Sequence, residues 1–123
     1  MDQVLLYLAA ALTGLWGIAH LFPTKAVVRD FGDISADNRR IITMEWIVEG
    51  IALIFIGVLV AAVTYIDPVS AVSRAVYGLS FFGLLVLAAV SLFTGFEVNF
   101  FLFKLCPVIF TASAVLILLG GFI

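Results

Sequence analysis

Charged residues are scarce in this sequence: they make up 11% of its 123 residues, against about 25% in an ordinary soluble domain. Apolar residues make up 65%, where about 45–50% is usual. A water-soluble domain of this length has too small an interior to bury so many apolar side chains, and the remainder would form patches that aggregate. A lipid bilayer removes this conflict, so we predict an integral membrane protein surrounded by lipid.

The sequence also lacks the residues that several kinds of site require. A single cysteine, Cys106, excludes an intrachain disulfide, and we interpret it as a small buried hydrophobic residue. A single histidine, His20, cannot supply both axial ligands of a haem and is too few for the ligand sets that predict a transition-metal site. The net charge of -2, without a long Lys/Arg cluster, argues against nucleic acid. We therefore assign no metal ligand, no catalytic residue and no nucleic-acid partner.

Four apolar runs are long enough to cross about 30 Å of hydrocarbon, which requires roughly 20 helical residues. They are predicted at 4–22, 41–66, 76–94 and 100–122. The runs are continuous rather than alternating, so each is predicted to be a helix and not a barrel strand. The fold class is therefore an all-α integral membrane four-helix bundle, a single domain over 1–123. Asp67 and Pro68 are predicted to cap and begin the third of these helices, and Gly95 to end it.

The longest connection, 23–40, mixes apolar and charged side chains. Two interpretations of it stay open, a segment at the level of the lipid headgroups or a polar loop, with a break expected at Gly32. Only one basic residue, Arg74, is expected on the side of the termini. The others are Lys25, Arg29, Arg39, Arg40 and Lys104. By the positive-inside rule, we expect the first and third loops in the cytoplasm and both termini outside, in a bacterial inner membrane.

Four ionisable side chains lie within or beside the apolar runs: His20, Glu45, Glu49 and Lys104. Such a group costs on the order of 2.5–3.5 kcal/mol at the membrane centre, so it needs a partner, water or a change of protonation state. All four are expected in the cytoplasmic half of the bundle, where they could meet. Glu45 and Glu49 share one face of their helix, and Trp16 and His20 share one face of theirs, because each pair is four residues apart.

Two interpretations of these ionisable residues stay open. They form either a structural polar cluster or a site for a proton, a redox-active small molecule or, with weaker support from the ligand set, a metal ion.

Small residues recur at spacings that let transmembrane helices approach closely. They are Ala10, Gly14, Gly17, Gly57, Ala61, Gly78 and Gly83. Lipid tails are as apolar as the helix surfaces, so close packing has to supply the contact energy between helices. We interpret these residues as packing positions and not as a site.

Two short motifs in this sequence resemble the DoxX-like family of small four-helix membrane proteins. They are GIAHL at 17–21, which contains His20, and EWIVEGIALIFIG at 45–57, which contains Glu45 and Glu49. The resemblance covers the first half of the chain, and the second half only by size and hydropathy. It implies a membrane subunit of a quinone-linked or sulfur-linked redox system.

Three hypotheses for the function follow. The first, which we favour, is an accessory or quinone-contacting subunit of a membrane redox assembly with no activity of its own, in which quinone is the ligand. Its site residues would be His20, Glu45, Glu49, Trp16 and Lys104. The second is a proton-coupled small-solute transporter acting as a homo-oligomer, in which Glu49 changes protonation state. The third is a structural or assembly protein without a ligand, whose apolar faces contact a partner helix in a larger membrane complex.

Overall fold

The computed structural model describes residues 1–123 and is entirely helical outside its turns and loops. Its helices are α1 (Gln3–Leu21), α2 (Thr24–Asp30), α3 (Ala36–Ile66), α4 (Ala71–Thr94) and α5 (Phe101–Phe122). All except the seven-residue α2 are long and apolar enough to cross a membrane. The predicted fold class, an all-α membrane bundle with four spanning helices, is therefore confirmed.

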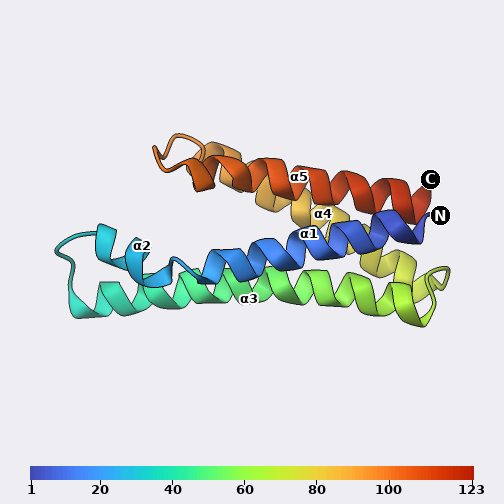
Figure 1. The fold of residues 1–123 in the computed structure, drawn as a ribbon, viewed down its shortest axis with the longest axis horizontal. Helices are drawn as coiled ribbons and strands as arrows, with labels where there is room; N and C mark the ends of the chain where they lie inside the picture. Colours follow the sequence, from blue (N-terminus) through green and yellow to red (C-terminus); the bar gives the residue numbers. More distant parts are fainter.

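The four long helices alternate in direction, so the two chain ends meet at one end of the bundle (Figure 1). There the backbone N–H of Asp2 donates to the carbonyl of Gly120 over 2.8 Å. α1 packs against α3 and α5, α4 packs against α5, and the contact between α3 and α4 is the loosest of the four. Figure 1 shows the α4–α5 pair diverging from the α1–α3 pair away from the termini. We call the end with the termini the closed end, and the end with α2 the open end.

α3 begins five residues earlier than its apolar run predicts, at Ala36 instead of 41. The hydroxyl of Ser35 accepts from the N–H of Asn38 over 3.1 Å and caps the helix. With 31 residues, α3 is about 46 Å long, which exceeds the hydrocarbon thickness of about 30 Å. A hydropathy pattern identifies only the part of a helix that lies in lipid. The charged first turns of α3 at the open end were therefore not predicted as helix.

α4 begins at Ala71, and the predictions of its start at 76 and of a cap by Asp67 and Pro68 are both wrong. The Ser70 hydroxyl caps this helix by accepting from the N–H of Ser73 over 3.1 Å. Asp67 instead ends α3, and its carboxylate accepts from the N–H of Val69 in the connecting turn. The prediction that Gly95 ends α4 is confirmed.

The segment between α1 and α3 contains the short helix α2, which packs beside the start of α3. Gly32 follows it with φ of +77°, a conformation that glycine adopts without steric cost, so the predicted break is confirmed. Val28 is buried, whereas Lys25 and Arg29 are exposed. α2 therefore places one apolar face on the bundle and its charges outward, at the open end.

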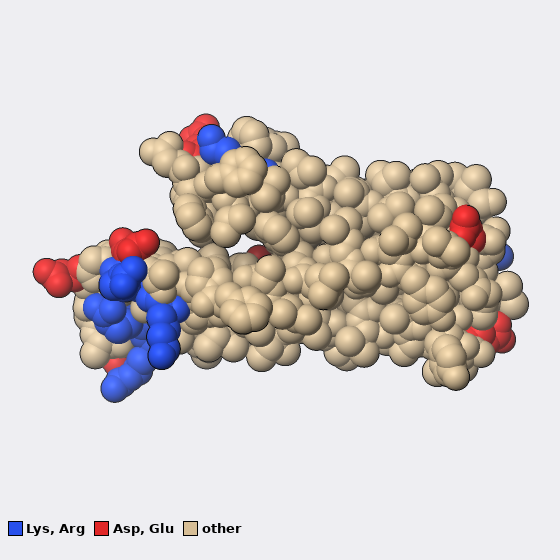
Figure 2. Space-filling model, in the orientation of Figure 1, with Lys and Arg blue, Asp and Glu red and all other residues tan.

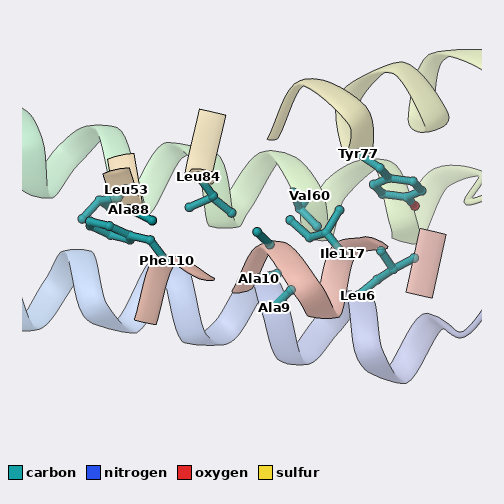
Figure 3. Packing of buried hydrophobic residues seen from close by; sticks show 11 residues of the cluster. Leu6, Ala9, Ala10, Leu53, Val60, Tyr77, Leu84, Ala88, Phe110 and Ile117 are labelled. Carbon is teal, nitrogen blue, oxygen red and sulfur yellow. The ribbon is translucent and has the colours of Figure 1, made fainter. Parts of the chain in front are cut away.

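Most large apolar side chains face away from the bundle. Only 23 of the 123 residues are buried, too few for a water-soluble domain with this composition, and the exposed apolar faces of the long helices suit contact with lipid. The buried core is a narrow seam between the four long helices (Figure 3). Its members are Leu6, Ala9, Ala10, Leu53, Val60, Tyr77, Leu84, Ala88, Phe110, Ala114 and Ile117.

Glycines set the close contact between α1 and α3. A Cβ atom on Gly57 would lie 2.6 Å from the carbonyl oxygen of Ala10, and one on Gly17 would lie 2.7 Å from that of Gly50. Real Cβ atoms do not approach so closely, so the two backbones can meet only because these positions lack a side chain. Gly83, in contrast, faces open space, so its prediction as a packing position is wrong.

We predict that Gly57→Ala lowers the free energy of unfolding by about 1–3 kcal/mol, the usual cost of overpacking. The matched control is Gly83→Ala, where no heavy atom lies within 4 Å of the added methyl group. We expect the control to leave stability unchanged or slightly raised, because alanine favours helix over glycine. Unfolding of both variants in lipid nanodiscs, followed by circular dichroism, checks this. Equal losses in the two variants would contradict the close α1–α3 contact.

Candidate functional site

His20 lies in the last turn of α1 at the open end, and Trp46 of α3 holds it on two sides. The indole N–H of Trp46 donates to the backbone carbonyl of His20 over 2.7 Å. The last carbonyls of a helix have no partner within the helix, so this bond satisfies a group that lipid cannot. The imidazole also stacks on the indole, with centroids 3.9 Å apart and planes at 16°. One tryptophan therefore positions both the backbone and the ring of His20.

The carboxylate of Glu49 lies beside the imidazole of His20. Its Oε2 lies 3.4 Å from His20 Nε2, within ion-pair distance, but the two groups are not aligned as a hydrogen bond. The His20 side chain is only 7% exposed, whereas that of Glu49 is 44% exposed. The pair results from the glycine contact described above, because Gly17 is one turn before His20 and Gly50 directly follows Glu49.

A cavity of about 340 Å³ lies between the α1–α3 and α4–α5 pairs at the open end. Figure 2 shows the hollow between the two arms, with an acidic side chain inside it. All four spanning helices contribute to its wall. From α1 and α3 come Trp16, Ala19, His20, Trp46 and Glu49, and from α4 and α5 come Val90, Ser91, Thr94, Leu102, Phe103 and Cys106. The wall is therefore mainly apolar and aromatic, with one ionisable pair.

Two buried nitrogen atoms in residues of the cavity wall have no hydrogen-bond partner. They are Nε1 of Trp16 and Nε2 of His20. A buried polar group without a partner costs about 1–3 kcal/mol, so native proteins leave few of them. The indole nitrogen can only donate a hydrogen bond. The wall of the cavity therefore contains hydrogen-bonding groups that the protein itself does not use.

Aromatic rings connect the two sides of the cavity, Trp46 from α3 and Phe103 from α5. Phe103 meets Trp46 edge to face, with centroids 5.7 Å apart, and Phe100 meets Phe103 at 5.9 Å. Pro107 follows one turn later inside α5 and lacks an N–H, so the carbonyl of Phe103 has no helical donor. Cys106 is half-buried on the cavity wall, in contrast to its interpretation as an ordinary buried core residue.

The predicted site residues do not all meet. Trp16, His20 and Glu49 share the cavity. Glu45 is one turn away from Glu49 on the same face of α3 and lines a separate groove outside the cavity. Lys104 Nζ lies over the ring of Phe96, 5.7 Å from its centroid, and forms no ion pair. Lys104 therefore does not contact the carboxylates, because its side chain turns toward the loop at the open end, and of the predicted basic residues it is His20 that lies beside Glu49.

Sequence reasoning missed Trp46, the residue that holds His20. A tryptophan in an apolar run has no signal that separates it from ordinary packing. Its position three residues before Glu49, on the same face of α3, was the available clue. The contribution of the α4 hydroxyls to the cavity wall was also missed. The Ser91 hydroxyl donates to the Leu87 carbonyl over 2.6 Å, and a serine bonded back to its own helix in this way cannot be told in the sequence from one with a packing role.

Comparison with known proteins leaves the site without a homologous template. No protein-family model matches the chain, and no curated protein or solved structure is significantly similar to it.

We predict that Trp46→Phe lowers the free energy of unfolding more than Trp16→Phe, by about 0.5–1.5 kcal/mol, the worth of a typical hydrogen bond. Both changes shorten an aromatic side chain in the same cavity wall, but only Trp46 loses a bond, because Trp16 Nε1 has no partner. Parallel unfolding of the two variants in nanodiscs measures the difference. Equal stability would show that the bond to His20 contributes nothing.

Proposed function

We propose that this membrane protein binds a lipid-soluble ligand of the quinone class in the cavity at its open end, as an accessory subunit of a redox assembly. The observation that carries the proposal is the combination of an apolar, aromatic cavity with two donors that lack partners. Its volume of about 340 Å³ lies at the lower end of the range of about 300–1,000 Å³ that is usual for small-molecule sites.

A quinone head matches the chemistry of this wall. It is a flat ring with carbonyl oxygens that only accept hydrogen bonds. The unpartnered nitrogens of Trp16 and His20 are buried in the wall and would donate to such a ring once the side chains that cover them shift. The ring of Phe103 and the face of the Trp46 indole that His20 does not cover supply surfaces for a flat ring. An isoprenoid tail could leave between α3 and α4, the loosest of the helix contacts.

The setting we propose is a bacterial inner membrane with the open end in the cytoplasm. Five basic residues lie on the segments at this end, and Arg74 alone lies at the other (Figure 2). The resemblance of 17–21 and 45–57 to DoxX-like proteins supports the proposal of a subunit in a membrane redox assembly. We assign the chain no chemistry of its own, so a partner in the assembly would supply the electrons. The exposed apolar helix faces offer that partner, or a second copy, a surface for contact.

Tryptophan fluorescence tests this proposal directly, because the protein has two tryptophans and both line the cavity. Quinones quench indole emission at close range. We expect a short-chain benzoquinone to quench the protein in nanodiscs with a saturable curve. A His20→Ala, Glu49→Gln double variant removes the imidazole donor and the charge of the carboxylate beside it, and should weaken binding about tenfold or more, which corresponds to about 1.4 kcal/mol.

The matched control is Glu97→Gln, which removes an exposed carboxylate from the α4–α5 loop without touching the cavity wall. This variant should bind as the wild type does. Full retention of binding in the double variant, or quenching that does not saturate, would refute the proposed site.

A further inference from the structure

Glu49 borders two hollows. It belongs to the wall of the cavity, and it also belongs to a groove on the outer side of α3. Trp46 is the one other residue in both walls. The remaining groove residues are Phe31, which follows α2, and Ile42, Glu45 and Val48 of α3. A carboxylate therefore stands between the cavity and the surroundings of α2.

Three titratable side chains lead from the surface to the cavity wall. Glu45 and Glu49 are both exposed, the side chain of Glu49 to 44%, whereas that of His20 is only 7% exposed. Residues four apart on a helix have Cβ atoms about 5–6 Å apart, so Glu45 and Glu49 are neighbours on one face. Glu49 Oε2 then lies 3.4 Å from His20 Nε2. The series leads from the outside of the open end to an unpartnered nitrogen in the cavity wall.

The cavity has no such series toward the closed end. One helical turn beyond Glu49, Ser91 and Cys106, the lining gives way to buried apolar side chains. They are Leu53 of α3, Ala88 of α4 and Phe110 of α5, which lie together in Figure 3. No ionisable side chain belongs to this core seam apart from the phenol of Tyr77 near the closed end. The buried polar groups on this side, among them Thr13 and Ser113, are hydroxyls, so a proton that reaches His20 from the open end meets no further ionisable side chain before Tyr77.

We propose that Glu45, Glu49 and His20 form a one-sided proton path from the open end into the cavity. Glu49 exchanges protons with water in the groove, with Glu45 as the outer acceptor. It transfers a proton to Nε2 of His20 whenever that nitrogen has given its own proton to the ligand, which restores Nε2 as a donor. The use of this path rests on the proposed function. A quinone reduced in the cavity to its quinol takes up two electrons, from a flavin or a dithiol of a partner, and two protons, which the path supplies.

Other charged groups near the open end do not interrupt this series. On α4 the wall contributes only the hydroxyls of Ser91 and Thr94, and on α5 it contributes the thiol of Cys106. The remaining charged residues at this end are Lys25, Arg29, Asp30, Asp33, Asp37, Arg39, Arg40, Glu97 and Lys104. None of them forms an ion pair with His20 or Glu49, and Arg29 and Arg40 pair with Asp30 and Asp37.

The single histidine allows a direct test without any ligand. Protein labelled with nitrogen-15 at histidine and held in lipid bilayers gives imidazole signals from His20 alone. We expect exchange of the imidazole proton with water in the wild type, slowed at least tenfold in Glu49→Gln and less in Glu45→Gln. Glu49→Asp, which keeps a carboxylate on a shorter stem, should restore part of the rate. Glu97→Gln serves as the control and should exchange as the wild type does.

Wild-type exchange in Glu49→Gln would overturn the path, because it means that water reaches His20 directly, and so would the absence of exchange in the wild type. Loss of exchange in Glu49→Gln without any recovery in Glu49→Asp would assign Glu49 a structural role and also refute the path. The nitrogen-15 measurements contain no quinone. Their outcome is therefore independent of the fluorescence quenching experiment, which tests ligand binding alone.

Discussion

The contact between the backbones of α1 and α3 is the constraint on which the rest of this structure depends. Gly17 against Gly50, and Gly57 against Ala10 and Gly14, allow the two helices to approach more closely than any side chain would permit. Without a hydrophobic drive between helices in lipid, such close packing is what holds a pair together. The same contact brings the last turn of α1 onto the residues of α3 that carry Trp46 and Glu49.

The polar chemistry of the open end follows from that approach. The end of α1 leaves carbonyl groups without helical partners, and Trp46 satisfies the one on His20. The stacked imidazole is thereby fixed beside Glu49, which limits the cost of placing both groups in a membrane. The α4–α5 helix pair packs on α1 through α5 and diverges from α3. His20 and Glu49 therefore face a cavity instead of a closed core.

The spanning helices could be predicted from the sequence because a run of about 20 apolar residues is a strong and local signal. The starts of α3 at Ala36 and of α4 at Ala71 could not be predicted in this way. Their first turns are not continuously apolar, and the position of each start is set by a serine that caps the helix. The proximity of His20 and Glu49 followed from their shared half of the bundle. The cavity and the role of Trp46 depend on how helices distant in sequence diverge, and no spacing within one helix encodes that.

The binding of a quinone-class ligand in the cavity at the open end can be tested directly by photolabelling with an azido-substituted quinone in nanodiscs, with the labelled residues located by peptide mass spectrometry. We expect adducts on wall residues such as Trp46, Phe103 and Cys106, and their loss when excess unlabelled quinone competes. Adducts spread over lipid-facing residues such as Leu79 and Phe82, without competition, would contradict binding in this cavity.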